Sequence, residues 1–146
     1  MANPSALQTL VDLAQRESDN RAKRLGVALK AVEEAEQKLQ MLLGYRQDYA
    51  DRLDQAQMNG ITPFAYANFV AFLGKLDNAI NGQHEVIKHA EYKADTERKA
   101  LQESERKRLS YRTLNERAAA QALAIETRRD QKTMDDFAAR TARMKR

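Results

Sequence analysis

The fold is decided by the stretch Met58-Asn59-Gly60-Ile61-Thr62-Pro63-Phe64. Asn59 and Gly60 are residues that tolerate positive φ and can end a helix. Thr62 can cap a following helix through its side chain, and Pro63 fits the first helical position, where its missing N–H costs nothing. We therefore expect a turn over residues 58–63 with one long helix on each side of it.

The chain before this turn carries a regular pattern of apolar and small residues, at alternating steps of four and three. Its members are Leu7, Val11, Ala14, Ser18, Arg21, Leu25, Ala28, Val32, Ala35, Leu39, Leu42, Arg46, Tyr49 and Leu53. This spacing is a heptad seam, the contact line of a coiled coil. With Asn3 as a cap and Pro4 at the first position, it predicts a helix over residues 4–57.

The same spacing resumes after the turn, over residues 69–125. Its members are Phe69, Leu73, Leu76, Ile80, Gln83, Ile87, Ala90, Ala94, Glu97, Leu101, Ser104, Arg108, Tyr111, Asn115, Ala118, Ala122 and Ile125. Asn81-Gly82 is itself a turn signal and leaves open a three-helix arrangement with a short middle helix. The heptad phase does not change across it, which favours one helix over residues 64–140.

Two helices joined by a short turn pack as antiparallel neighbours. Folding at Ile61 pairs positions whose numbers sum to about 122, so Leu39 faces Gln83 and Leu7 faces Asn115. We expect an all-α fold: one monomeric domain over residues 1–146, built as a long antiparallel coiled-coil hairpin. The second helix then runs past the first from about residue 118, as an overhang with no helix to pair with.

The two ends of the seam differ in polarity. Near the turn it is apolar and aromatic, whereas toward the chain ends it carries Ser18, Arg21, Glu97, Ser104, Arg108 and Asn115. Polar seam positions lower stability and fix the register of the two helices. We expect the hairpin to be tight at its bend and loose at its open end.

Charge is distributed unevenly along the chain. From Arg98 onward there are 14 Lys and Arg against 7 Asp and Glu, which gives this last third a net charge of +7. A basic segment suits an acidic partner, although it can also be an ordinary solvated helical face. Acids such as Glu116 and Asp130 interrupt it, and no DNA-reading motif is present, so we expect no nucleic acid partner.

The sequence offers little for catalysis, metals or cofactors. There is no Cys, and His84 and His89 are five residues apart, about 140° around a helix, which does not suit a metal pair. No phosphate-binding loop or nucleophile elbow is found. No signal peptide or membrane span is recognisable. We expect a cytoplasmic protein that is not an enzyme and holds no cofactor or metal.

Two surfaces stand out for binding. The first is a stripe formed by Phe72, Leu76, Ala79 and Gln83, which shares Leu76 and Gln83 with the seam and widens the apolar face beside it. It is either a broader contact between the two helices or a partner surface. The second is the overhang, where Met134 and Phe137 place large apolar groups beyond any partner helix. A single exposed Phe is unremarkable, but with Met three residues away it favours a binding face.

With these residues in view, the chain resembles the flagellar type III export protein family FliJ over its whole length. The stretches that carry the resemblance are Leu7-Gln8-Thr9-Leu10-Val11-Asp12-Leu13-Ala14, Met41-Leu42-Leu43-Gly44-Tyr45 with Tyr49 and Leu53, Asn59-Gly60-Ile61, and the run from Asp130 to Ala138. The resemblance implies a two-stranded antiparallel coiled coil similar to the central stalk of rotary ATPases. It also implies three partners: a hexameric export ATPase, a membrane export-gate protein and export chaperones.

The resemblance assigns residues to two of these contacts. Phe72, Leu76 and Ala79 match the family's gate-contacting stripe, and Gln83 occupies the last step, where the family can have His. The end that enters the ATPase ring corresponds to Arg128, Arg129, Asp130, Gln131, Lys132, Met134 and Phe137. The resemblance places the protein in the cytoplasm, peripherally at the inner membrane of the flagellar base. An escort that recycles chaperones, a generic coiled-coil adaptor and a stalk from a virulence secretion system remain alternatives.

Overall fold

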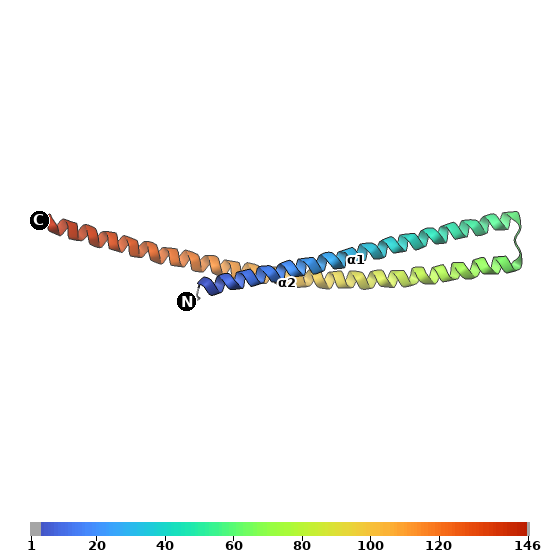
Figure 1. Ribbon diagram of the computed structural model, residues 1–146, viewed down its shortest axis with the longest axis horizontal. Helices are drawn as coiled ribbons and strands as arrows, with labels where there is room; N and C mark the ends of the chain where they lie inside the picture. The colour runs from blue at the N-terminus through green and yellow to red at the C-terminus, as the bar shows by residue number, and fades with distance from the viewer. Residues whose placement is uncertain (1–3, 146) are drawn as a thin grey trace. The chain divides into compact units, whose positions relative to one another are not determined.

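The computed structural model describes residues 4–145, and these residues form two helices with no strand. The first, α1, runs from Pro4–Asn59, and the second, α2, from Pro63–Met144. The two helices pack against each other as a hairpin (Figure 1). The prediction of an all-α antiparallel hairpin is confirmed. The three-helix alternative is wrong, because α2 continues through Asn81-Gly82 without a break.

The turn between the helices uses the residues that the sequence indicates. Gly60 has a φ of 88°, the left-handed conformation that glycine adopts without strain. The N–H of Gly60 donates to the carbonyl of Gln57 at 3.4 Å. On the other side, the hydroxyl of Thr62 accepts from the N–H of Ala65 at 3.2 Å, as an N-cap does.

The helices extend slightly further than their predicted bounds. Helix α1 includes Asn59, and it ends there because the next residue, Gly60, has a positive φ. Helix α2 continues to Met144 instead of 140, since neither Gly nor Pro follows Phe137 to stop it. The predicted cap Asn3 lies outside the described residues.

The chain divides into two compact units, which we name by their position. The bend unit is Arg21–Leu101, and the terminal unit combines the chain up to Asn20 with the chain from Gln102 onward. In both units the residues of the predicted seam on α1 are buried or half-buried, and so are those on α2 from Phe69 to Ala118. The heptad assignment is therefore confirmed over these positions. The last two predicted seam residues, Ala122 and Ile125, are exposed instead, because α1 begins at Pro4 and does not extend beside them.

In the bend unit, the seam is packed by small side chains with a few larger ones. Its buried residues are Ala28, Ala35, Leu39, Leu76, Ile80, Gln83 and Ala94. The ring of Tyr49 lies 4.9 Å from that of Phe69, one turn from the predicted partner Leu53. The side-chain amide of Gln83 donates to the carbonyl of Ala35 at 2.9 Å, one turn from the predicted partner Leu39.

In the terminal unit, polar side chains join the two helices. The hydroxyl of Ser18, which is buried, donates to the carboxylate of Glu105. The guanidinium of Arg108 donates to the same carboxylate at 2.7 Å. Further along, the amide of Asn115 donates to the side chain of Gln8 at 3.0 Å, beside the predicted partner Leu7. This unit therefore adds several side-chain hydrogen bonds to the packing of buried apolar residues such as Leu7 and Ala14.

The glycines within the helices provide a first test of this description. An added Cβ at Gly44 would meet no atom within 4 Å. We expect Gly44→Ala to raise the free energy of unfolding by about 0.5–1 kcal/mol, because alanine loses less backbone freedom on folding. Gly60→Ala should lower it by about 1–2 kcal/mol, since its φ of 88° strains any residue with a Cβ. Urea unfolding followed by circular dichroism measures both, and a stabilising Gly60→Ala would contradict the turn geometry.

The Glu105 cluster provides a second test. The bonds from Arg108 and Ser18 hold the pKa of Glu105 below its ordinary value. A lowered carboxyl pKa stabilises the fold above the unfolded-state pKa, near 4.3, and this contribution is lost as the pH falls through the folded-state pKa. We expect Glu105→Gln to lower the melting temperature at neutral pH, with a difference from wild type that shrinks in acid.

The matched control is Glu103→Gln, because Glu103 is exposed and pairs only with Arg106 on its own helix. Its melting temperature should stay close to that of wild type at every pH. An equal loss of melting temperature in both variants would show that Glu105 stabilises the fold only through its negative charge, and not through its bonds to Ser18 and Arg108.

Candidate interaction surfaces

The structure divides the predicted stripe on α2 between the surface and the helix interface. Phe72 is 44% exposed and Ala79 is exposed. Leu76 and Gln83 are buried at 9% and 6% exposure. Phe72 and Ala79 are seven residues apart, so they lie on the same flank of the helix. Only these two residues of the stripe are accessible to a partner while the two helices stay paired.

Helix α1 holds the exposed Phe72 of the stripe in place. The ring of Phe72 lies 4.5 Å from the ring of Tyr49 at an interplanar angle of 50°. This tilted arrangement is favourable for aromatic pairs and restricts the ring of Phe72. The amide of Gln83 is already bonded to Ala35. Gln83 thus contributes to the register of the helices, and Phe72 presents a fixed apolar group.

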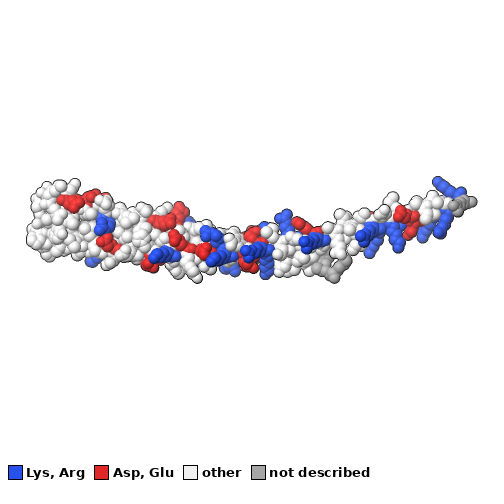
Figure 2. Space-filling view, turned by 180° about the vertical axis from the view of Figure 1, so that it is seen from behind, with Lys and Arg blue, Asp and Glu red and all other residues white. Residues whose placement is uncertain are grey.

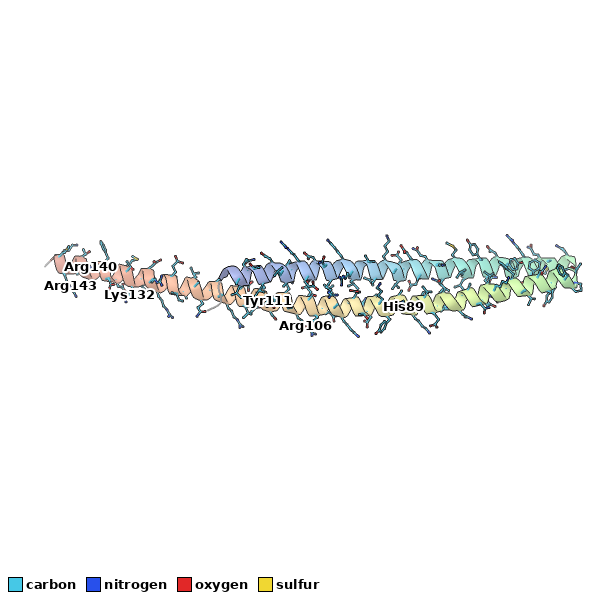
Figure 3. The ribbon with its side chains drawn as sticks, turned by 60° about the horizontal axis from the view of Figure 1, so that its bottom comes forward. His89, Arg106, Tyr111, Lys132, Arg140 and Arg143 are labelled. Atoms are coloured by element: carbon cyan, nitrogen blue, oxygen red, sulfur yellow. The ribbon has the colours of Figure 1, made fainter. Side chains whose placement is uncertain are left out.

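The predicted ring-contacting residues all lie on exposed helix. Every residue from 119 to 140 is exposed, and this segment together with the remainder of α2 to Met144 is the overhang. Met134 and Phe137 are each 72% exposed. Figure 3 shows Lys132, Arg140 and Arg143 on this segment, with no second described helix beside them. The hydroxyls of Thr127, Thr133 and Thr141 donate to carbonyls four residues earlier in the same helix.

Most large apolar side chains of the overhang lie on one side of the helix. At 100° per residue, four of the five fall within an arc of about 80°, and they are Leu123, Met134, Phe137 and Met144, at 64%, 72%, 72% and 87% exposure. Asp130 lies within the same arc, and the fifth, Ile125, lies about 140° from its centre. A second arc, centred about 120° away, holds four basic residues with Asp136 among them. The basic residues are Arg129, Lys132, Arg140 and Arg143. Sequence reasoning missed Leu123 and Met144, although their spacings of eleven and seven from Met134 and Phe137 could have revealed them.

Charged side chains are distributed differently on the visible faces of the bend unit and the overhang. In Figure 2, acidic residues are numerous on the visible face of the bend unit, and basic residues predominate on that of the overhang. Over residues 119–144, however, five Lys and Arg stand against four Asp and Glu, a net charge of +1. The exposed apolar side chains of the overhang therefore distinguish it more than its charge does, and they suit a partner that offers an apolar surface.

Neither a metal site nor a membrane-spanning segment is found among the described residues. No three His, Cys, Asp or Glu side chains among residues 4–145 come together in a way that could hold a metal ion. Neither α1 nor α2, as described, has a segment that is both long and apolar enough to cross a membrane. His84 lines an open groove with Glu33, Glu36 and Leu39.

Comparison with known proteins gives a consistent assignment. A family model described as Flagellar FliJ protein matches residues 3–146. The flagellar FliJ protein of Salmonella typhi is 36% identical over 145 residues, which cover 99% of each chain. That of Escherichia coli (strain K12) is 34% identical over 145 residues with the same coverage. A Chlamydia trachomatis structure described as a YscO homologue matches with a TM-score of 0.48 and 17% identity, over 97% of this chain and 91% of that one. From the family model and the two relatives, we conclude that this chain belongs to the flagellar FliJ protein family.

Proposed function

We propose that this chain is a non-enzymatic component of the flagellar type III export apparatus, where it couples a hexameric export ATPase to a membrane export gate. Membership of the FliJ family supports a flagellar role. The proposed location is the cytoplasmic side of the inner membrane at the flagellar base. The observation that carries the proposal is the overhang, a helix whose apolar groups have no intramolecular cover among the described residues.

The proposed contact with the ATPase is made by the overhang. A single helix of this length gains little stability in water from its own hydrogen bonds. Docking would bury Met134 and Phe137, which are each 72% exposed in the free chain. Arg128, Arg129 and Lys132 would be attracted to acidic loops around a ring opening, which makes the binding sensitive to salt.

The proposed contact with the gate is made by Phe72 and Ala79. Phe72 combines partial exposure with a fixed ring orientation, because Tyr49 packs against it. A side chain that is already ordered loses little conformational entropy on binding. Leu76 and Gln83 support this surface from beneath, as they are buried between the helices.

Coupling requires that the two contacts be mechanically connected. Phe72 and Phe137 lie on one uninterrupted helix, α2, which extends over 82 residues. The candidate gate residues belong to the bend unit and the candidate ring residues to the terminal unit. One protein could therefore engage both partners through different residues.

A chaperone escort is the competing function, since it also needs exposed helical faces. The two functions differ in what the overhang does. A stalk needs the overhang to stimulate the ATPase, whereas an escort needs it to hold chaperones. Removing the overhang should therefore abolish ATPase stimulation if the chain is a stalk, and chaperone binding if it is an escort.

We expect truncation after Thr127 to abolish stimulation of the export ATPase while leaving the paired helices folded. Phe137→Ala should cause a partial loss, because it removes one exposed aromatic anchor. The measurement is ATP hydrolysis by the purified ATPase with each variant, with helicity checked by circular dichroism. The matched control is Phe64→Ala, which removes an equally exposed Phe, 77% against 72%, from the bend unit. A folded truncated protein that stimulates fully but no longer binds chaperones would favour the escort.

We expect Phe72→Ala to weaken binding to the soluble part of the gate protein by about tenfold or more, as is typical for an aromatic anchor. Leu76→Ala is a poorer probe, since Leu76 is buried and its truncation destabilises the fold. Tyr92→Ala serves as control, because Tyr92 is an exposed aromatic on α2 outside the stripe. Calorimetry gives the affinities. Unchanged binding by a fully helical Phe72→Ala would show that Phe72 serves only to pack on Tyr49.

A further inference from the structure

The bend of the hairpin differs from the rest of the chain in having no charge. Residues 55–74 contain no Asp, Glu, Lys or Arg, although 32% of the whole chain is charged. The same segment holds three of the four Phe residues. In Figure 2 the outermost part of the corresponding end is white, and acidic residues begin a short way behind it. We call these twenty residues the tip.

The tip carries large apolar side chains that its own helices do not cover. Met58 is 87% exposed and Phe64 is 77% exposed, one on each side of the turn. Tyr66 and Val70 are 44% and 46% exposed. At 100° per residue, Phe64 lies roughly 160° from Tyr66 and 120° from Val70 around α2. The exposed apolar groups therefore surround the tip instead of forming one stripe.

This arrangement limits what can cover the tip. A flat partner surface would bury one side and leave the others in water, whereas a surrounding apolar environment covers all of them. We propose that the tip inserts shallowly into the interfacial layer of a lipid bilayer, with Met58 and Phe64 reaching furthest. This inference does not depend on the proposed gate contact, because it needs only lipid.

The chemistry of the tip suits this layer. Aromatic side chains with a polar end, such as Tyr66, are favoured where the headgroups meet the acyl chains. The polar backbone of the turn is partly paired already, through the bond from Gly60 to Gln57 and the cap from Thr62 to Ala65. Paired groups cost less to move out of water, and headgroups and water can satisfy the remaining ones.

Two other occupants fit less well. A second copy of the chain would need roughly 20 to 30 residues on each side for a stable interface, and the tip exposes only a few large apolar groups. A protein socket commonly surrounds its apolar core with a polar rim, and the tip has no charged residue to match a charged rim. Lipid binding here would also resist salt, since no charge attracts the tip to headgroups.

The test exploits the absence of Trp from this chain. Phe64→Trp places a single fluorophore at the tip. With protein-free phosphatidylcholine vesicles, we expect its emission to shift to shorter wavelength and to be quenched by lipids brominated on the acyl chain, at low and high salt alike. The matched control is Tyr92→Trp, at a position of nearly equal exposure, 73% against 77%, between the charged residues Glu91 and Lys93, which should show neither effect in these vesicles.

A second variant shows whether a change in Trp emission comes from insertion of the tip or from a local change around position 64. Adding Met58→Asp to Phe64→Trp should reduce vesicle partitioning by about tenfold or more, since it replaces an apolar group with a charge. Circular dichroism should show unchanged helicity, because Met58 is exposed. No shift and no quenching with Phe64→Trp at saturating lipid would overturn the proposal. A shift seen only with the purified gate protein would assign the tip to a protein socket and overturn it equally.

Discussion

The close packing of small side chains along one seam is the interaction on which both units depend. Ala28, Ala35 and Ala94 are among the most buried apolar residues of the bend unit, whereas larger side chains such as Val27 and Tyr92 are more than 70% exposed. Each buried alanine removes little apolar surface from water, so stability is spread over many positions. Two helices held in this way keep their outer faces free. The molecule can then present several surfaces without unfolding any of its core.

The unequal length of the helices follows from where the turn lies. Gly60 ends α1 after 56 residues, and α2 continues for 82. The seam positions of the excess helix are Ala122 and Ile125 at first and then the charged residues Arg129 and Lys132, so the heptad pattern ends within the overhang. Several large apolar groups, such as Met134 and Phe137, lie on a different face of this helix and are exposed.

Much of this structure could be predicted from the sequence, because its local signals agree with one another. The turn follows from the chemistry of Gly60, Thr62 and Pro63, and the seam from a heptad phase that persists from Phe69 to Ala118. The register was predicted to within one turn, as the bond from Gln83 to Ala35 shows. Hydrogen bonds made by residues outside the seam could not be predicted, because heptad spacing does not fix the rotamer that brings a side chain to the other helix. The carboxylate of Glu105, which accepts from Ser18 and Arg108, is one example. The heptad seam placed Leu76 and Gln83 at the helix interface, where they are buried, but it did not show whether Phe72 and Ala79 would widen that interface or stay accessible.

The central claim is that one chain contacts the ATPase with its overhang and the gate with its bend unit. Photo-crosslinking in cells tests it most directly, with benzoylphenylalanine placed at position 137, at position 72, or at the exposed control position 92. The account predicts crosslinks from 137 to the export ATPase, from 72 to the gate protein, and to neither from 92. Crosslinks from both 137 and 72 to chaperones, with none to the ATPase or the gate, would contradict it.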